Sequence, residues 1–166
     1  MYTHQTSSPL HRRYTLEYNV FKFKPSHINN FNVQDMQREE WEAFLRLEEV
    51  DGYSEWLEEK KRTITLSMDG EVISIMGVLP MPHGGGTVWL FLNGDVQGHG
   101  LRLATKCVGG ALDGLKDMGY EWVQTGVRDD FTQGRRWAKL LGFKETVYKG
   151  DLMDNGTIYT YWTKVL

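Results

Sequence analysis

Apolar and polar residues alternate near the start of the chain and then change to a helical spacing. The alternation over residues 14–24 predicts a strand, in which Tyr18 and Val20 share one side with either Phe21 or Phe23. The proline that follows ends this strand, because proline has no N–H to donate to a sheet.

Two amphipathic helices are expected next. Asn32 offers an N-cap to a helix over residues 33–50, whose apolar residues fall on one face. Ser54 caps a second, short helix over residues 55–61. The acids of these helices are expected to form solvated faces rather than paired catalytic carboxylates: Glu39, Glu40, Glu48, Glu49, Glu58 and Glu59.

A hairpin and a further strand follow the helices. Residues 63–68 and 71–79 are strand-like and flank an Asp-Gly dipeptide at 69–70, which is typical of a two-residue hairpin turn. The prolines and glycines of residues 80–86 predict a mobile loop that leads to an apolar strand over residues 88–92.

The second half of the chain alternates helices with strands. The expected elements are a helix at 101–118 ended by Gly119, a strand at 120–127, a helix at 132–141 ended by Gly142, and strands at 144–151 and 156–165. Gly109, Gly110 and Gly114 are costly inside the first of these helices. They indicate either a close approach to the sheet or a weakened helix.

This order of elements predicts an α/β fold with one mixed, twisted sheet of about seven strands and helices on both faces. The expected order is strand, two helices, three strands, helix, strand, helix and two strands. Residues 14–166 have the length of a single domain. Residues 1–13 are polar and aperiodic, so we expect a flexible N-terminal arm.

Composition and charge narrow the function classes. The formal net charge of −3 and the pI near 5.9 provide no basic surface for nucleic acid. Cys107 is the only cysteine, which excludes an internal disulfide and a cysteine-based metal cluster. His4 and His11 lack metal-ligand spacing. No apolar run approaches the roughly 20 residues that span a bilayer. We therefore expect a soluble, intracellular protein without a metal.

The stretch over residues 87–106 carries the chemistry that can be read from the chain. It runs from a strand through a glycine-containing loop into a helix, which presents free backbone N–H groups and the positive end of a helix dipole to an anion such as pyrophosphate. The alternative interpretation is that Gly94, Gly98 and Gly100 simply allow the chain to turn between two packed elements.

The element order, the glycine loop and a final helix that ends in Leu-Gly-Phe resemble the GNAT superfamily of N-acetyltransferases. The resemblance implies acetyl-CoA held between the fourth and fifth strands, with its pyrophosphate on a loop of pattern Arg/Gln-x-x-Gly-x-Gly/Ala. Arg102 stands at the last small position, so its side chain either crowds the phosphate pocket or points outward and adds positive charge. The cofactor-binding residues implied are Gln97, Gly98, His99, Gly100, Leu101 and Arg102.

The second motif of the superfamily is incomplete in this chain. Residues 141–143 match its Leu-Gly-Phe ending, but Phe131 stands where asparagine is common. Ala138 stands where many of these enzymes place the tyrosine that protonates the departing thiolate. The candidates for a base are Asp95, His99, Glu121 and His83, and Cys107 could replace the tyrosine as the acid. None of them has a recognisable partner, so no catalytic residue is predicted.

A closer resemblance, over residues 20–166, is to the GNAT-like internal virion proteins of short-tailed bacteriophages. It rests on residues 63–77, the aromatic strand over 88–91, the Gly-Asp-Val of 94–96, and residues 135–143. It implies a virion-associated or assembly component with degenerate catalytic motifs, found in the host cytoplasm and the virion with other virion proteins. The alternative is an acetyl-CoA-dependent N-acetyltransferase that acts on a small amine or a protein amino group.

Overall fold

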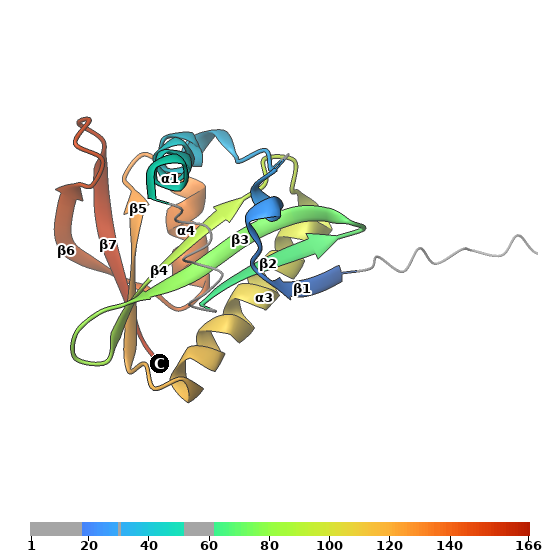
Figure 1. Ribbon diagram of the computed structural model, residues 1–166. Helices are drawn as coiled ribbons and strands as arrows, with labels where there is room; N and C mark the ends of the chain where they lie inside the picture. Colours follow the sequence, from blue (N-terminus) through green and yellow to red (C-terminus); the bar gives the residue numbers. More distant parts are fainter. Residues whose placement is uncertain (1–17, 30, 52–61) are drawn as a thin grey trace, which may run out of the picture.

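The computed structural model describes residues 18–29, 31–51 and 62–166. Within these ranges the chain forms a seven-stranded mixed sheet with the order β1-β2-β3-β4-β5-β7-β6 (Figure 1). The predicted α/β class and the mixed sheet of about seven strands are confirmed. The expected arm over residues 1–13 and the short helix over residues 55–61 lie outside the described residues.

The elements have the following bounds. The strands are β1 (Tyr18–Lys22), β2 (Thr63–Met68), β3 (Glu71–Pro80), β4 (Gly85–Leu92), β5 (Trp122–Arg128), β6 (Lys144–Asp151) and β7 (Ile158–Val165). The α-helices are α1 (Arg38–Asp51), α3 (Gly98–Asp117) and α4 (Thr132–Leu140), and two 3-10 turns, η1 (Pro25–Ile28) and η2 (Asp35–Gln37), precede α1. Neighbouring strands are antiparallel except β4 and β5, which are parallel.

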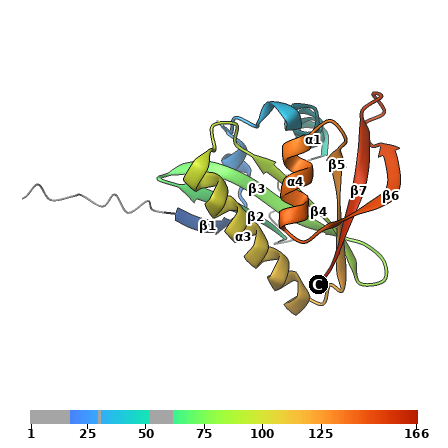
Figure 2. The ribbon, with the colours of Figure 1, turned by 180° about the vertical axis from the view of Figure 1, so that it is seen from behind.

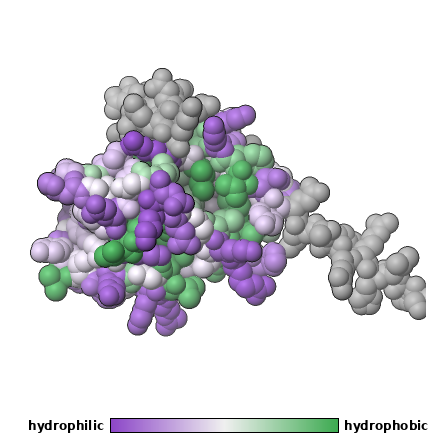
Figure 3. Space-filling model, turned by 90° about the horizontal axis from the view of Figure 1, so that it is seen from below, coloured by the Kyte–Doolittle hydropathy of each residue, from purple (hydrophilic) through white to green (hydrophobic). Residues whose placement is uncertain are grey.

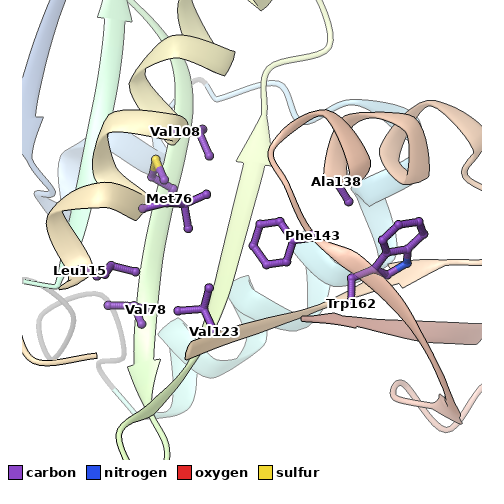
Figure 4. Packing of buried hydrophobic residues seen from close by; sticks show 9 residues of the cluster. Met76, Val78, Val108, Leu115, Val123, Ala138, Phe143 and Trp162 are labelled. Atoms are coloured by element: carbon purple, nitrogen blue, oxygen red, sulfur yellow. The ribbon is translucent and has the colours of Figure 1, made fainter. Parts of the chain in front are cut away.

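Helices cover both faces of the sheet, as Figures 1 and 2 show from opposite sides. On one face Trp41 and Phe44 of α1 pack on Phe91 of β4, with ring centroids 5.0 and 5.5 Å from it. On the other face α3 and α4 share an apolar cluster with the sheet (Figure 4). Its labelled members include Val108 of α3 and Ala138 of α4, with Phe143 drawn between them.

The hairpin of β2 and β3 forms as predicted. Asp69 and Gly70 have φ angles of 51° and 87°, the left-handed pair that a two-residue type I′ turn requires. The loop before β4 is shorter than predicted, because Pro80 belongs to β3 and Gly85 and Gly86 already belong to β4. A Cβ atom on Gly85 would lie 2.3 Å from the Trp122 ring, so the absence of a side chain lets β5 pair here.

The beginning of the chain differs from the expectation. All five residues of β1 are exposed, including Tyr18 and Val20, and the buried aromatic is Phe23, which follows the strand. Asn32 does not cap a helix: its carbonyl accepts the Gly94 N–H at 2.7 Å. The chain first makes η2, and α1 begins only at Arg38. Backbone pairing with the end of β4 therefore displaces the helix start.

The long helix α3 ends as expected, since Gly119 has a φ angle of 90°. It begins at Gly98, three residues before the predicted start. A Cβ atom on Gly109, Gly110 or Gly114 would meet no atom within 4 Å outside the helix itself, so a close approach to the sheet does not explain these glycines.

Polar side chains separate small apolar patches on the face of the molecule seen from below (Figure 3). Within the described part of the chain, no helix is both long and apolar enough to cross a membrane.

Candidate functional site

The two parallel strands of the sheet diverge along their length. Three residue pairs join β4 to β5, and the last of them is Thr87 with Gln124. Beyond Thr87 the strands separate, as Figure 1 shows. A cavity of about 310 Å³ occupies the resulting wedge. Most of its lining is apolar and comes from β4, β5, α3 and α4: Val88, Leu90, Val127, Val108, Leu112, Trp137, Ala138 and Leu141.

The inner edge of β4 offers backbone groups to this cavity. Gln37 occupies two of them: its Nε2 donates to the Leu90 carbonyl at 2.5 Å, and its Oε1 accepts the Leu92 N–H at 2.9 Å. Backbone groups of alternate residues in a strand face the same edge. The Leu90 N–H therefore also faces the wedge, at a level where β5 does not pair with β4. It is a donor suited to polarising a carbonyl group.

The glycine loop lies at the N-terminus of α3. Gly98 has a φ angle of 51°, and the N-cap Gln97 makes no side-chain capping bond. Gly100 is buried, and a Cβ atom there would lie 3.2 Å from Val96. Arg102 is exposed and does not line the cavity. None of the six residues from Gln97 to Arg102 lines the cavity.

The buried Tyr159 and the half-buried Glu40 form one part of the cavity wall. The Tyr159 hydroxyl donates to Glu40 Oε1 at 2.6 Å, and Tyr159 is only 3% exposed. Burial, followed by the hydrogen bond to Glu40, raises the pKa of Tyr159 well above its ordinary value. Glu40 Oε2 is buried and accepts no hydrogen bond. Both residues line the cavity.

Arg128 lies beside this pair and forms ion pairs with two other carboxylates. Its guanidinium contacts Asp130 at 3.0 Å and Glu39 at 3.4 Å. The hydrogen bond to Asp130 raises the pKa of Arg128 further above its usual range. Glu39 also accepts hydrogen bonds from Asn155 and Thr157. The expectation of a solvated face is therefore wrong for Glu40, whose Oε2 is buried, whereas the side chain of Glu39 is 45% exposed. Glu48, Glu49, Glu58 and Glu59 lie outside the residues whose side chains are described.

Comparison with solved structures finds the same fold in acetyltransferases. Ard1 from Thermoplasma volcanium has a TM-score of 0.67 at 14% identity, over 90% of this chain and 97% of that chain. A GNAT-family acetyltransferase from Bacillus anthracis has a TM-score of 0.59 at 11% identity, over 89% and 94%. The fold is that of the GNAT acetyltransferases. No protein-family model and no curated protein matches the chain.

A third GNAT-fold neighbour carries the cofactor. The structure of yncA from Salmonella typhimurium, which holds its cofactor acetyl-CoA, has a TM-score of 0.58 at 16% identity, over 70% of this chain and 73% of that chain. At these identities the likeness covers the fold alone.

Two positions of the GNAT motif carry apolar side chains in the cavity wall. Phe131 lines the cavity and lies over Gly134, where a Cβ atom would be 2.4 Å from its ring. Ala138, which the sequence resemblance aligns with the tyrosine of many GNAT enzymes, is buried and also lines the cavity. On α4, Trp137 Nε1 donates to Thr105 of α3 at 2.8 Å, which ties the two helices together at this wall.

The candidates for a base that the sequence suggested do not meet at the cavity. His83, Asp95, His99 and Glu121 are exposed, and none of them lines it. Cys107 of α3 packs against an apolar cluster that includes Leu66 of β2 and Leu103 of α3. Burial raises the pKa of its thiol and so disfavours the reactive thiolate.

The carboxylate that does reach the cavity, Glu40, follows Gln37 by three residues and precedes Phe44 by four. This helical spacing puts an acid on the apolar face of α1, and it is the signal that could have identified Glu40. Among residues 18–29, 31–51 and 62–166, no group of three or more His, Cys, Asp or Glu side chains could hold a metal ion.

Proposed function

We propose that the protein binds acetyl-CoA and transfers the acetyl group to a primary amine. The observation that carries the proposal is the apolar cavity in the wedge between β4 and β5, beside the Leu90 N–H. A closed sheet would have no room for a ligand here, whereas the separated strands leave about 310 Å³.

The chain offers groups suited to each part of the cofactor. Residues 97–102 would hold the pyrophosphate, since the first N–H groups of a helix attract anions and the exposed Arg102 adds a positive charge. The apolar wall from α3 and α4 would exclude water from the pantetheine chain. Bound acetyl-CoA supplies the acetyl group as a thioester, and the Leu90 N–H would donate to its carbonyl oxygen.

The loss of the tyrosine at Ala138 is compatible with transfer. A thiol has an ordinary pKa of about 8.5, so a thiolate is a stable leaving group near neutral pH. An alkoxide or an amine anion would need a proton as it departs, but a thiolate does not. The alanine is therefore expected to lower the rate without abolishing the reaction.

Isothermal titration with acetyl-CoA tests this function. We expect micromolar binding by the unaltered protein and its loss in Ala138→Phe, because the larger ring would fill the cavity. Leu140→Phe is the matched control, since Leu140 lies on the same helix and is 72% exposed. Circular dichroism would show whether each variant is folded. Absence of binding by the unaltered protein, or unchanged binding by Ala138→Phe, would contradict the proposal.

A second candidate function is a structural role in a bacteriophage particle or in its assembly, in the host cytoplasm and the virion, without acetyl transfer. Two observations favour it: Phe131 and Ala138 stand where the GNAT motif has polar residues, and both line the cavity with apolar atoms. The sequence resemblance to internal virion proteins supports the same role. Mass spectrometry of gradient-purified particles of the encoding phage would detect the chain, and thiol release from acetyl-CoA would stay at background over a panel of amines.

A further inference from the structure

Three carboxylates, Glu39, Glu40 and Asp130, surround one cation, Arg128, at the cavity. Of the described residues that line it, two carry a formal charge: Glu40 and Arg128. The guanidinium of Arg128 is shared between Asp130 and Glu39. The Glu40 carboxylate, in contrast, contacts only the uncharged Tyr159 hydroxyl in the described hydrogen bonds. A cation in the cavity would therefore be attracted, and an anion repelled.

The two carboxylate oxygens of Glu40 differ in their hydrogen bonding. Oε1 is committed to Tyr159, whose side chain is buried on β7. Oε2 is buried and lacks a donor. A buried carboxylate oxygen without a hydrogen bond is costly, and a bound ligand that supplied a donor would remove this cost. Glu40 itself lines the cavity, so a ligand bound there lies next to this carboxylate.

Apolar residues line the same cavity as this carboxylate. Phe91 and Trp89 lie along β4, and Leu152 and Met153 follow β6; all four line the cavity. A ligand that places a positive charge at Glu40 would thus bury its remaining atoms against apolar side chains. Such a ligand combines an ammonium group with an apolar substituent.

We propose that Glu40 forms the acceptor subsite: its carboxylate binds the ammonium group of a primary amine with an apolar substituent and then receives its proton. This inference rests on the proposed function for the acetyl transfer itself. In the proton step, one N–H bond of the ammonium breaks and an O–H bond forms on the Glu40 carboxylate. The amine becomes neutral, and its freed lone pair would form the new C–N bond to the acyl carbon. The C–S bond would then break, CoA would leave as the thiolate, and the second proton of the attacking nitrogen would pass to water. After product release the proton passes from Glu40 to water.

Equilibrium titration with two probes of the same shape tests the subsite without relying on activity. The probes are 2-phenylethylamine, which is a cation at pH 7, and 2-phenylethanol, which is neutral. We expect the unaltered protein to bind the amine about tenfold or more tightly than the alcohol, as one hydrogen bond to a charged group implies. Glu40→Gln should abolish this preference. Glu42→Gln, an exposed residue on the same helix, should keep it.

A third probe tests the subsite on the unaltered protein alone, so that this part of the test does not depend on whether a variant folds. The anion 3-phenylpropanoate should bind the unaltered protein more weakly than the alcohol does, because Glu40 repels it. Equal binding of the three probes, or a preference that survives in folded Glu40→Gln, would overturn the inference. Acetyl-CoA titration gives the separate answer on the proposed function: Glu40→Gln should leave its affinity unchanged while lowering kcat/KM for 2-phenylethylamine. If acetyl-CoA does not bind, only the transfer reaction is refuted.

Discussion

The Tyr159 hydroxyl and the Glu40 carboxylate form a 2.6 Å hydrogen bond between residues that are 119 positions apart in the chain. Glu40 belongs to α1, which packs on β4 through Trp41 and Phe44. Tyr159 belongs to β7, on the other side of the wedge. The bond therefore links the two parts of the sheet across the place where the strands separate.

Removal of this hydroxyl should destabilise the fold. Tyr159→Phe leaves the half-buried Glu40 carboxylate without its donor, so we expect the free energy of unfolding to fall by about 1.5–3 kcal/mol. Urea unfolding measures the loss. Tyr148→Phe serves as the control, because Tyr148 is 71% exposed and should change stability little. An equal effect of both substitutions would refute a specific role for the pair.

Tyr159 should also make the fold sensitive to alkali. Its pKa in the folded protein is raised above the value of about 10 in an unfolded chain, first by burial and then by Glu40. The resulting stability is fully present below pH 10 and is lost as the pH rises above it, because the unfolded tyrosine ionises first. Unfolding titrations between pH 9 and 11 should show a smaller loss in Tyr159→Phe than in the unaltered protein. Parallel curves would exclude this linkage.

Asp129 should contribute the opposite dependence at acid pH. Lys149 at 2.6 Å and the Thr160 hydroxyl lower the pKa of the Asp129 carboxyl below its ordinary value. Its stabilisation is present above about pH 4 and is lost as the pH falls through the folded pKa. Asp129→Asn should therefore be less stable than the unaltered protein at pH 7, with a difference that shrinks toward pH 2. Asp113→Asn, an exposed substitution on α3, should show no such trend.

Phe131 and Gly134 should be strongly coupled. Gly134→Ala would bring a Cβ atom to 2.4 Å from the Phe131 ring, so overpacking should destabilise the protein by about 1–3 kcal/mol. In a Phe131→Ala background the clash is absent, and the same alanine should stabilise α4 by about 0.5–1 kcal/mol. A double-mutant cycle by urea unfolding measures the coupling. Additive effects would mean that the ring moves aside without cost.

Gln37 should protect the inner edge of β4 from exchange with solvent. Its side chain accepts the Leu92 N–H and donates to the Leu90 carbonyl. Gln37→Ala should speed hydrogen exchange at the Leu92 amide and lower the free energy of unfolding by about 1–3 kcal/mol. Gln133→Ala, exposed on α4, is the control. Unchanged exchange at Leu92 would show that other groups shield this strand.

Local signals predicted most of the elements. The hairpin of β2 and β3 follows from Asp69-Gly70, since few residues other than glycine, asparagine and aspartate adopt the left-handed turn. The end of α3 follows from Gly119 in the same way. The helix start at Arg38 could not be found in this manner. It depends on the bond between Asn32 and Gly94, which lie far apart in the sequence.

The candidate site was only partly predictable, because local sequence signals mark one part of it and long-range contacts determine the rest. The glycine loop after β4 is a local motif, and the helix N-terminus was found there. Glu40 looked like a surface acid beside Glu39, because its burial depends on Tyr159 in the last strand. Arg102 could be placed in either of two ways from its size and charge alone, and only the packing of the loop decides that its side chain is exposed.

The short pairing of β4 with β5 has a consequence for association between molecules. Unpaired strand groups are a hazard at the outside of a sheet, since strands from other chains can add to them and start aggregates. The groups of the wedge lie in the middle of the strand order, with α1 on one face of the sheet and α3 and α4 on the other. A second protein molecule cannot insert a strand there without displacing these helices. The unpaired N–H and C=O groups of β4 can thus bind a small ligand, while the helices hinder strand addition by another copy of the chain.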